Sequence, residues 1–398
     1  MNSRAVLTQA IKAEARRLGF PLVGVTTPDP PPHLEVFERW LQCGRHGTMD
    51  YLATERARRC RADPRRILPE CRSILVLGAG YPSPASSPLF PAPLSLPLGK
   101  DRRGGEEQKG AEEGGQGWGL IGRVASYAWG EDYHLVLPKR LQTLAVFIER
   151  EVGEAIPHRW YTDTGPLLER ELAQRAGLGW IGKNTCLINP QAGSYFFLAE
   201  ILLGIELEAD FPFTADRCGS CTRCRDACPT GCILPDRTLD AARCISYLTI
   251  ELKSAVPPDL RPLMGNWVFG CDLCQQVCPW NRFAAPQGDA AFAPRAGVPA
   301  PDLLAELQLS SQEFNRKFKD SALQLAKRRG YLRNVAIALG NLGDETAIPA
   351  LTQSASHDPE PLVRAHAAWA REIIFLTHAR MKKAVQVSTI AAPEAMLT

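Results

Sequence analysis

The sequence of 398 residues predicts a multidomain α+β protein. Three observations support this fold class: short apolar runs alternate with amphipathic segments in the first half, cysteines crowd into a loop-rich stretch, and alanine-rich helical segments follow. The composition is typical of a globular protein, with 45% hydrophobic and 22% charged residues. The predicted divisions are residues 1–210, 211–298 and 299–382, followed by a frayed tail at 383–398.

The first division is predicted to be an α/β domain. An amphipathic helix is expected at its N-terminus, where apolar residues recur near helical spacing. Strands are expected at 22–25, 74–77 and 196–207, and helices at 31–52 and 140–152. Residues 83–119 are rich in proline and then in glycine and charge, which predicts a flexible surface insertion with no assigned role.

Several classes of protein are excluded by composition. The N-terminus is charged throughout and lacks the apolar core of a secretory signal, and no window is apolar enough to span a membrane. A cytoplasmic location is therefore expected. A net charge of +3 does not by itself indicate a nucleic-acid partner. No long heptad pattern suggests assembly, so a monomer is expected.

The second division carries the pattern of a bacterial two-cluster ferredoxin. A CxxCxxCxxxCP run extends from Cys218 to Pro229, and a CxxCxxxCP run extends from Cys271 to Pro279. In such runs three cysteines hold one 4Fe–4S cluster and the fourth reaches the other. The first cluster is predicted on Cys218, Cys221, Cys224 and Cys278, and the second on Cys228, Cys244, Cys271 and Cys274.

Disulfides and structural zinc account less well for the thirteen cysteines. Disulfides are not expected, because the count is odd and the spacing is clustered. Zinc could occupy the CxxC pairs, but zinc sites do not use the full run. Cys232 fits a packed thiol beside a cluster, and the remaining cysteines fit small buried residues: Cys43, Cys60, Cys71 and Cys186. The two clusters indicate single-electron transfer at low potential in a reducing compartment.

The third division resembles two units of a HEAT-like helical solenoid. YLRNVAIALGNLGD and LVRAHAAWAREII share a pattern in which Arg333 and Arg364 lie 31 residues apart. Two units are too few to stand alone, so this end should pack on the preceding domain. From Glu313 to Arg333 there are seven basic residues and two acidic ones. This stripe could bind phosphates or form a solvated helix face.

Several motifs, in order along nearly the whole chain, resemble the epoxyqueuosine reductase family. They are GRHGTMDY, RADPRRILP, WGEDYH, YTDTGPLLERELAQRAGLGWIGKNTCLINPQAGSYFFLAEILL, RCISYLTIE, GCDLCQQVCPWN and LRNVAIALGN. The long insertion at 83–119 is the main departure from the family. The resemblance implies reduction of epoxyqueuosine to queuosine at the wobble position of tRNA, the last step of queuosine biosynthesis. The epoxide would become an alkene and its oxygen would leave as water.

The resemblance also implies the cofactors and partners. The N-terminal domain would bind base-off cobalamin, as in the similar core of reductive dehalogenases, and the two 4Fe–4S clusters would supply its electrons. A C-terminal HEAT-like domain would bind tRNA carrying epoxyqueuosine in its anticodon loop. A low-potential donor of ferredoxin or flavodoxin type would reduce the clusters.

Residue roles follow from the same resemblance. Asp163 matches the family's proton donor and a cobalamin contact, although a turn or helix cap is its ordinary role in TDTGP. Arg61 matches a cobalamin contact, against the alternative of a solvated arginine in a basic run. Arg170 would lie near Asp163 and could tune its acidity. His134 is at least as compatible with a structural role as with a site role.

Further contacts are predicted from position. Lys183 and Asn184 are expected in a glycine-flanked turn facing the corrin, while Ser246 and Asp272 adjoin ligands of the second cluster. The residues predicted to bind tRNA are Lys327, Arg328, Arg329, Arg333 and Asn334. Two alternative functions remain open: a small-molecule reductase of dehalogenase type, and an electron carrier or RNA-binding scaffold without chemistry of its own.

Overall fold

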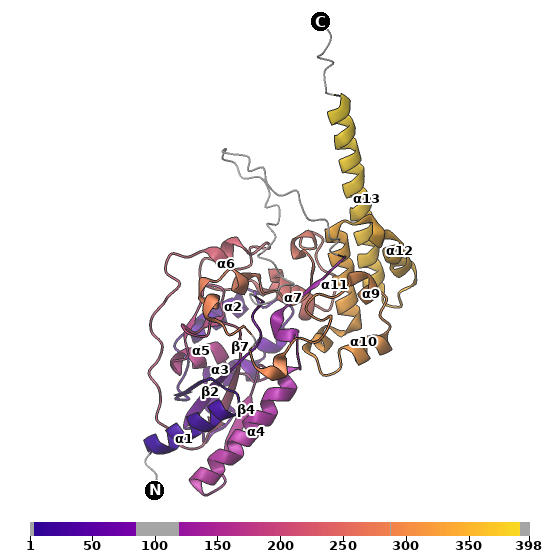
Figure 1. Cartoon of the computed structure of the whole chain (residues 1–398). Coiled ribbons are helices and arrows are strands. Elements are labelled where there is room, and N and C mark those ends of the chain that lie inside the picture. The colour runs from indigo at the N-terminus through magenta and orange to yellow at the C-terminus, as the bar shows by residue number, and fades with distance from the viewer. Residues whose placement is uncertain (1–3, 85–118, 287, 391–398) are drawn as a thin grey trace.

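The computed structural model describes residues 4–84, 119–286 and 288–390 (Figure 1). The predicted insertion at 83–119 lies almost wholly outside these residues, as does 391–398. The helices are α1 (Arg4–Arg17), α2 (Leu34–Gln42), α3 (Glu55–Ala62), α4 (Tyr133–Val152), α5 (Glu169–Arg175), α6 (Arg223–Asp226), α7 (Ile245–Ile250), α8 (Leu273–Gln276), α9 (Leu303–Leu307), α10 (Ser311–Lys317), α11 (Lys327–Leu342), α12 (Ile348–His357) and α13 (Pro361–Ile390). The strands are β1 (Leu22–Thr26), β2 (Ser73–Gly80), β3 (Arg123–Val124), β4 (His158–Tyr161), β5 (Trp180–Ile181), β6 (Leu187–Ile188), β7 (Phe196–Leu203) and β8 (Trp267–Phe269).

The main sheet has the strand order β1-β2-β7-β4, and every pair in it is antiparallel. The expected α/β arrangement is therefore wrong in the strict sense, although the mixed α+β class is correct. The prediction failed because β2 is buried on both faces. A strand buried on both faces gives a continuous hydrophobic run, and such runs are typical of the parallel sheets of α/β proteins.

Helices cover both faces of this sheet. One face packs against α1 and α4 through a core that includes Ile11, Leu77 and Leu141. The other face packs against α5 and the β5–β6 hairpin, with Val76 and Leu172 in its core. The contact at the end of α5 is so close that a Cβ on Gly24 would lie 2.1 Å from the carbonyl oxygen of Ala176.

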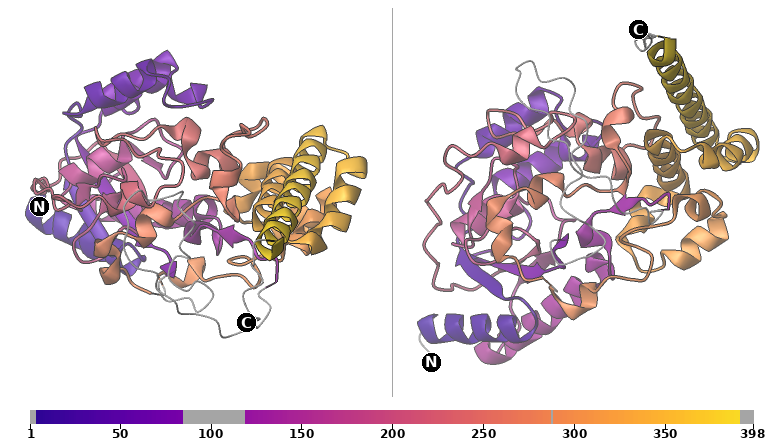
Figure 2. Two further views of the ribbon diagram at one scale, coloured as in Figure 1. Left: turned by 90° about the horizontal axis from the view of Figure 1, so that it is seen from above. Right: turned by 45° about the horizontal axis from the view of Figure 1, so that its top comes forward.

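A second body is formed by the cysteine-rich loops and the C-terminal helices. The parallel pair β3–β8 joins residues 123–124 to residues 267–269. The core beside it combines Val124 and Phe269 with Leu332, Val335 and other residues of α11 and α13. The C-terminal helices thus pack on the preceding residues, as the small number of repeat units predicts. Figures 1 and 2 show them gathered on one side, with α13 projecting beyond the body.

Several element boundaries differ from the predictions. The helix expected at 31–52 is helical only over α2, since Gly44 and Gly47 with positive φ turn the chain after it. Helix α4 begins seven residues before the predicted Arg140, because it tolerates Pro138 in its interior. Strand β7 ends at Leu203. The tail predicted to fray from 383 is helical as far as Ile390, since no glycine or proline interrupts α13 after Pro361.

The question of a membrane span can be addressed only for the described ranges. Within residues 4–84, 119–286 and 288–390, no helix combines the length and the apolar character needed to cross a bilayer.

Candidate active site

Asp163 lies in the loop after β4 in a left-handed backbone conformation, with φ of 59°. Aspartate adopts this region more readily than most residues, but it is uncommon and often found at functional sites. The Asp163 N–H donates to Glu169 Oε1 at 2.7 Å, and the preceding Thr162 hydroxyl donates to the Leu198 carbonyl at 2.9 Å. Asp163 does not cap α5, whose N-cap position is Leu168, so the helix-cap interpretation is wrong.

The Asp163 carboxyl meets the first turn of α4. Tyr133 donates its hydroxyl to Asp163 Oδ2 at 2.6 Å, and His134 Nε2 lies 3.7 Å from the same oxygen. The other ring nitrogen of His134 contacts Asp132 Oδ1 at 2.8 Å, and Asp132 also caps the helix. Tyr133 is held by stacking on Phe197, with ring centroids 4.3 Å apart. The structure therefore places His134 in the candidate site.

Electrostatics distribute the proton within this cluster. Burial would raise the pKa of Asp163, but its interactions with His134 and Tyr133 hold the pKa below the ordinary value. Burial would lower the pKa of His134, yet Asp132 and Asp163 raise it to about 9. At neutral pH Asp163 is a carboxylate and His134 is the imidazolium. In the protein alone Asp163 is therefore deprotonated, because its hydrogen-bond donors outweigh desolvation.

Two further carboxyls lie behind Asp163. Burial and the charge of Asp163 raise the pKa of Glu169 to about 8. Glu200, in the middle of β7, is fully buried, and neither carboxyl oxygen has a hydrogen-bond partner among the described residues. Burial raises the pKa of Glu200 well above its ordinary value, so it is neutral. Sequence reasoning missed both, although a glutamate inside the apolar run FFLAEILL was a usable signal.

Arg61 and Tyr51 stand near this carboxyl cluster. Arg61 is 8% exposed, donates to the Ala57 carbonyl at 3.2 Å and lies over the ring of Phe37. Burial lowers its pKa, and it forms no ion pair with a described residue, so the solvated-arginine interpretation is wrong. Tyr51 is 58% exposed, yet burial and the nearby Glu251 and Asp163 carboxylates raise its pKa to about 12.

The β5–β6 hairpin carries Lys183 and Asn184 in its turn. Lys183 Nζ donates to the carbonyls of Gly219 and Cys221, at 2.6 and 2.9 Å, and so clamps the loop of the predicted first cluster. Asn184 is 5% exposed and accepts the Cys186 N–H at 3.3 Å. Its Nδ2 donor is buried without a described partner. An orphaned buried donor fits a site that receives a ligand acceptor.

The eight predicted cluster ligands lie half-buried in the loops around α6, α7 and α8. Cys232 is 2% exposed, and its Sγ lies 3.4 Å from that of Cys228, which agrees with a packed thiol. Of the four cysteines expected to be buried, Cys60 and Cys71 are buried, Cys186 is half-buried and Cys43 is exposed. An interaction with Cys274 lowers the pKa of Cys186. The Trp180 indole N–H lies 3.4 Å from Cys218 Sγ.

Asp272 connects these loops to the candidate site. It is 2% exposed, accepts the Ser126 N–H at 2.6 Å, and has a pKa raised by burial to about 6. Tyr127 is the residue that follows Ser126. Burial raises the pKa of Tyr127 well above its ordinary value, and the charges of Asp163 and Asp272 raise it further. Tyr127 is therefore near both aspartates. Ser246 is half-exposed in α7, beside Cys244.

The five residues predicted to bind tRNA divide into two groups. Lys327 and Arg329 are exposed at the start of α11. Arg328 pairs with Asp358 at 2.6 Å and is only partly accessible. Arg333 and Asn334 are fully buried, so their prediction as tRNA contacts is wrong. Their side chains bind backbone carbonyls of the preceding module: Leu248, Leu252 and Ser254 for Arg333, and Thr249 and Val268 for Asn334.

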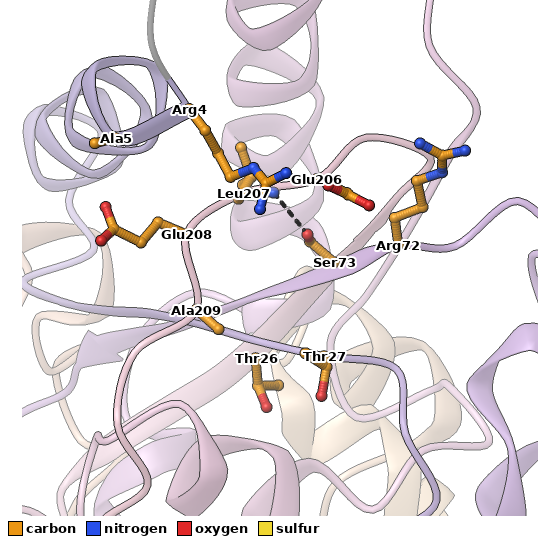
Figure 3. A pocket seen from close by; sticks show the side chains of 10 residues that line it. All are labelled: Arg4, Ala5, Thr26, Thr27, Arg72, Ser73, Glu206, Leu207, Glu208 and Ala209. Carbon is orange, nitrogen blue, oxygen red and sulfur yellow. Dashed lines mark hydrogen bonds and ion pairs between the residues drawn. The ribbon is translucent and has the colours of Figure 1, made fainter.

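A separate hollow of about 650 Å³ lies between the start of α1, the end of β1 and residues 206–209 (Figure 3). Arg4 and Arg72 face it, and one wall is fixed by the Leu207 N–H bond to Ser73 Oγ at 2.8 Å. None of its lining residues belongs to the predicted site, so the hollow is not assigned to the chemistry.

Comparisons with known proteins identify two family models in the chain. Residues 61–164 match "Epoxyqueuosine reductase QueG, DUF1730", and residues 217–281 match "4Fe-4S double cluster binding domain". The latter range contains all eight predicted cluster ligands. The chain is 40% identical over 366 residues to an epoxyqueuosine reductase of Pseudomonas aeruginosa, covering 92% of this chain and 94% of that one. It is 39% identical to that of Escherichia coli, covering 92% and 88%.

Solved structures show the same similarity. A crystal structure of epoxyqueuosine reductase with a tRNA-Tyr epoxyqueuosine-modified tRNA stem loop matches with a TM-score of 0.79 at 32% identity. That match covers 92% of this chain and 90% of the other. The enzyme from Streptococcus thermophilus matches with a TM-score of 0.78 at 31% identity, covering 94% and 90%.

Proposed function

The chain belongs to the epoxyqueuosine reductase family, and on that premise we propose that it reduces epoxyqueuosine in a tRNA to queuosine. The observation that carries the proposal is the juxtaposition of a proton-holding cluster, Asp163 with Tyr133 and His134, and a module lined by eight thiols. The alternative of a carrier without chemistry is set aside, because enzymes of the family match over 92% of the chain. No observation favours a small-molecule substrate.

The reaction needs two electrons and two protons for each epoxide. Two C–O bonds break, an alkene forms, and the oxygen leaves as water. Electrons would arrive singly through the cluster on Cys218, Cys221, Cys224 and Cys278 and then through the cluster on Cys228, Cys244, Cys271 and Cys274. This order is supported by Asp272, which follows Cys271 and accepts the Ser126 N–H, because the neighbouring Tyr127 is near Asp163.

A cobalamin would fit between these loops and Asp163. Among the described residues, the buried Asn184 Nδ2 has no partner and the buried Arg61 has no carboxylate, so both are donors suited to its amide and phosphate oxygens. Arg170, Ser246, Asp272 and the Lys183 turn are the other proposed contacts, with Lys183 acting through the first cluster loop. When bound, cobalamin would supply a cobalt centre of very low potential that can act on the epoxide carbon.

Side chains of the protein would supply the protons and transfer them to the substrate. His134 holds one at neutral pH, 3.7 Å from Asp163 Oδ2, and Tyr133 donates to the same oxygen. We infer that Asp163, a carboxylate at rest, takes a proton from His134 and passes it to the departing oxygen. Asp132 fixes the imidazole orientation from its far side.

The tRNA would bind along the C-terminal helices, which we assign as a HEAT-like domain. Lys327 and Arg329 offer exposed cations at the start of α11, and Arg316 and Lys319 are exposed nearby in the chain. Tyr51, exposed near Asp163, is suited to stack on an extruded base. Arg333 and Asn334 would serve by holding α11 on the cluster module.

The deciding experiment is a mass analysis of a tRNA bearing epoxyqueuosine after anaerobic incubation with reconstituted protein, cobalamin and a low-potential reductant. Loss of one oxygen atom that requires cobalamin would support the substrate, the cofactor and the reaction together. An unchanged tRNA, with both clusters verified by iron and sulfide content, would contradict the proposed substrate.

A further inference from the structure

Arginines surround the predicted first cluster. Arg217 precedes Cys218, Arg223 and Arg225 flank Cys224 on α6, and Arg282 follows Cys278 by four residues. Arg217, Arg223 and Arg282 are exposed, and Arg225 is half-exposed. We call these four residues the arginine patch.

The second cluster has different neighbours. Cys271 is followed by the buried Asp272, and Cys274 lies between Leu273 and Gln275, both buried. Arg243, before Cys244, donates its Nε to the Thr230 carbonyl at 3.0 Å. Among the described residues next to the predicted ligands in sequence, arginines are therefore concentrated around the first set.

The cations of the patch are not neutralised locally. None of the four forms an ion pair with a carboxylate in the described ranges, since Asp216 pairs with Arg237 and Asp226 accepts the Thr222 hydroxyl. Arg217 instead lies over the rings of Phe213 and Trp280, and Arg282 lies over Phe283, which is 43% exposed. Exposed arginine combined with aromatic side chains is a composition enriched in protein–protein interfaces.

We propose that the arginine patch is the docking surface for an acidic, low-potential, one-electron carrier protein that reduces the first cluster. This proposal rests on the proposed function in one respect only, namely that the reduction of epoxyqueuosine requires electrons from a donor. In each encounter the reduced carrier gives one electron to the oxidised first cluster and leaves oxidised. Two encounters supply the electron pair for one epoxide.

A protein carrier suits this surface better than tRNA does. The patch borders the cluster that has to accept the electron, and its aromatic side chains offer apolar contact as well as charge. The cations proposed for tRNA lie on α11, and Figure 1 shows α6 and α11 in separate parts of the molecule. Transient electron-transfer complexes have small interfaces that depend on charge steering, so their association rates fall as salt screens the charges.

The test measures cluster reduction without tRNA. The full chain, loaded with both clusters, is mixed anaerobically with flavodoxin hydroquinone as the probe, and the bimolecular rate constant is followed by stopped-flow absorbance across a range of salt. The expected result for Arg223→Glu/Arg225→Glu is a loss of about tenfold or more at low salt, and a weaker salt dependence than in the unmodified protein. Arg159→Glu, at an exposed position on β4, is the matched control and should leave the rate unchanged.

A neutral reductant separates docking from changes in the cluster. Reduction by photoreduced 5-deazariboflavin should be equal in all variants. An equal loss with this small reductant would mean that the arginines set cluster reactivity, and the proposal would fail. It would fail equally if flavodoxin reduced the variant at the unmodified rate, or if only tRNA affinity fell. If the double variant does not load its clusters, Arg282→Glu, which lies outside α6, takes its place in the same comparison of the two reductants.

Discussion

At the scale of single residues, the site depends on how one proton is shared. Asp163, Tyr133 and His134 meet at a single carboxyl oxygen, and Asp132 holds the imidazole from behind. The motifs TDTGP and WGEDYH each supply part of this group, but only the fold brings α4 to the loop after β4. Replacing one residue of this group should therefore reduce the rate of the reaction more than it reduces the stability of the fold.

Replacing Asp163 with asparagine tests its role directly. The amide keeps the shape and still accepts the Tyr133 hydroxyl, but it cannot pass on a proton. Turnover of epoxyqueuosine tRNA should fall by about 10²–10⁴-fold, with cobalamin uptake and the melting temperature little changed. Turnover at the unmodified rate would remove Asp163 from the reaction.

The raised pKa of His134 predicts an alkaline limit. Its ordinary value of 6.5 rises to about 9 in the fold, so its contribution to stability is complete below 6.5 and is lost as the pH rises through about 9. Single-turnover rates should fall over the same upper range, because the proton store empties. His134→Gln should abolish this limb of the pH–rate profile, and a persisting limb near pH 9 would assign the titration to another group.

Glu200 should reduce stability at neutral pH. Its buried carboxyl has no partner in the part of the chain that the structure describes and stays protonated, which opposes folding at every pH above its unfolded pKa of 4.5. Glu200→Met should raise the free energy of unfolding at pH 7 by about 1–3 kcal/mol, and the gain should shrink as the pH falls toward 4.5. Thermal melts of the two proteins across this range make the measurement, and a lower melting temperature for the variant would reveal a partner for Glu200.

At the scale of elements, α11 is fixed to the cluster module by buried polar bonds. Arg333 donates to the Leu248 carbonyl at 2.5 Å and to the Leu252 and Ser254 carbonyls at 2.7 Å. These bonds satisfy carbonyls at the end of α7 and in the loop that follows it. The basic residue that sequence spacing aligned with Arg364 is thus a structural anchor.

Removing this anchor should destabilise the protein. Arg333→Met leaves three carbonyls without their donor, and a loss of about 3–5 kcal/mol in the free energy of unfolding is expected. Arg329→Met, at an exposed position four residues earlier in the same helix, is the control and should change stability by about 0.5 kcal/mol or less. Chemical denaturation of both variants compares them, and equal stability would contradict the anchoring role.

At the scale of the whole molecule, the surfaces proposed for the electron carrier and for tRNA lie on different parts of the protein. The exposed Lys327 and Arg329 lie at the start of α11, while the arginine patch lies on and around α6, in a separate part of the molecule (Figure 1). Asp272 accepts the Ser126 N–H, and the neighbouring Tyr127 is close enough to both Asp272 and Asp163 for each to raise its pKa. Electrons and tRNA can then reach the same site from different surfaces.

The tRNA surface is testable through salt dependence. Lys327→Gln/Arg329→Gln removes two exposed cations, so binding of a tRNA anticodon stem loop should weaken at every salt concentration. The slope of log affinity against log salt should fall by about 1.4–1.8. Fluorescence anisotropy over a salt series measures this slope. An unchanged slope would place the tRNA elsewhere on the molecule.

The sequence alone determined the chemistry that local spacing encodes. Eight cysteines in two ferredoxin-like runs lie within the matched double-cluster domain, since cluster loops require close spacing along the chain. Strands 22–25 and 74–77 were also predicted, because a short apolar run is buried in the core whatever its position in the chain. Family motifs indicated the enzyme, and the relatives bear this out.

The tertiary structure decided what depends on contacts between distant segments. Whether Arg333 meets water or carbonyls depends on α7 packing against it, which no local pattern encodes. The pairing of His134 with Asp163 joins two segments 29 residues apart, and the antiparallel sheet could not be distinguished from a parallel one by apolar runs. Burial and charge environment set the proton on His134 rather than on Asp163, because pKa values respond to neighbours in space and not in sequence.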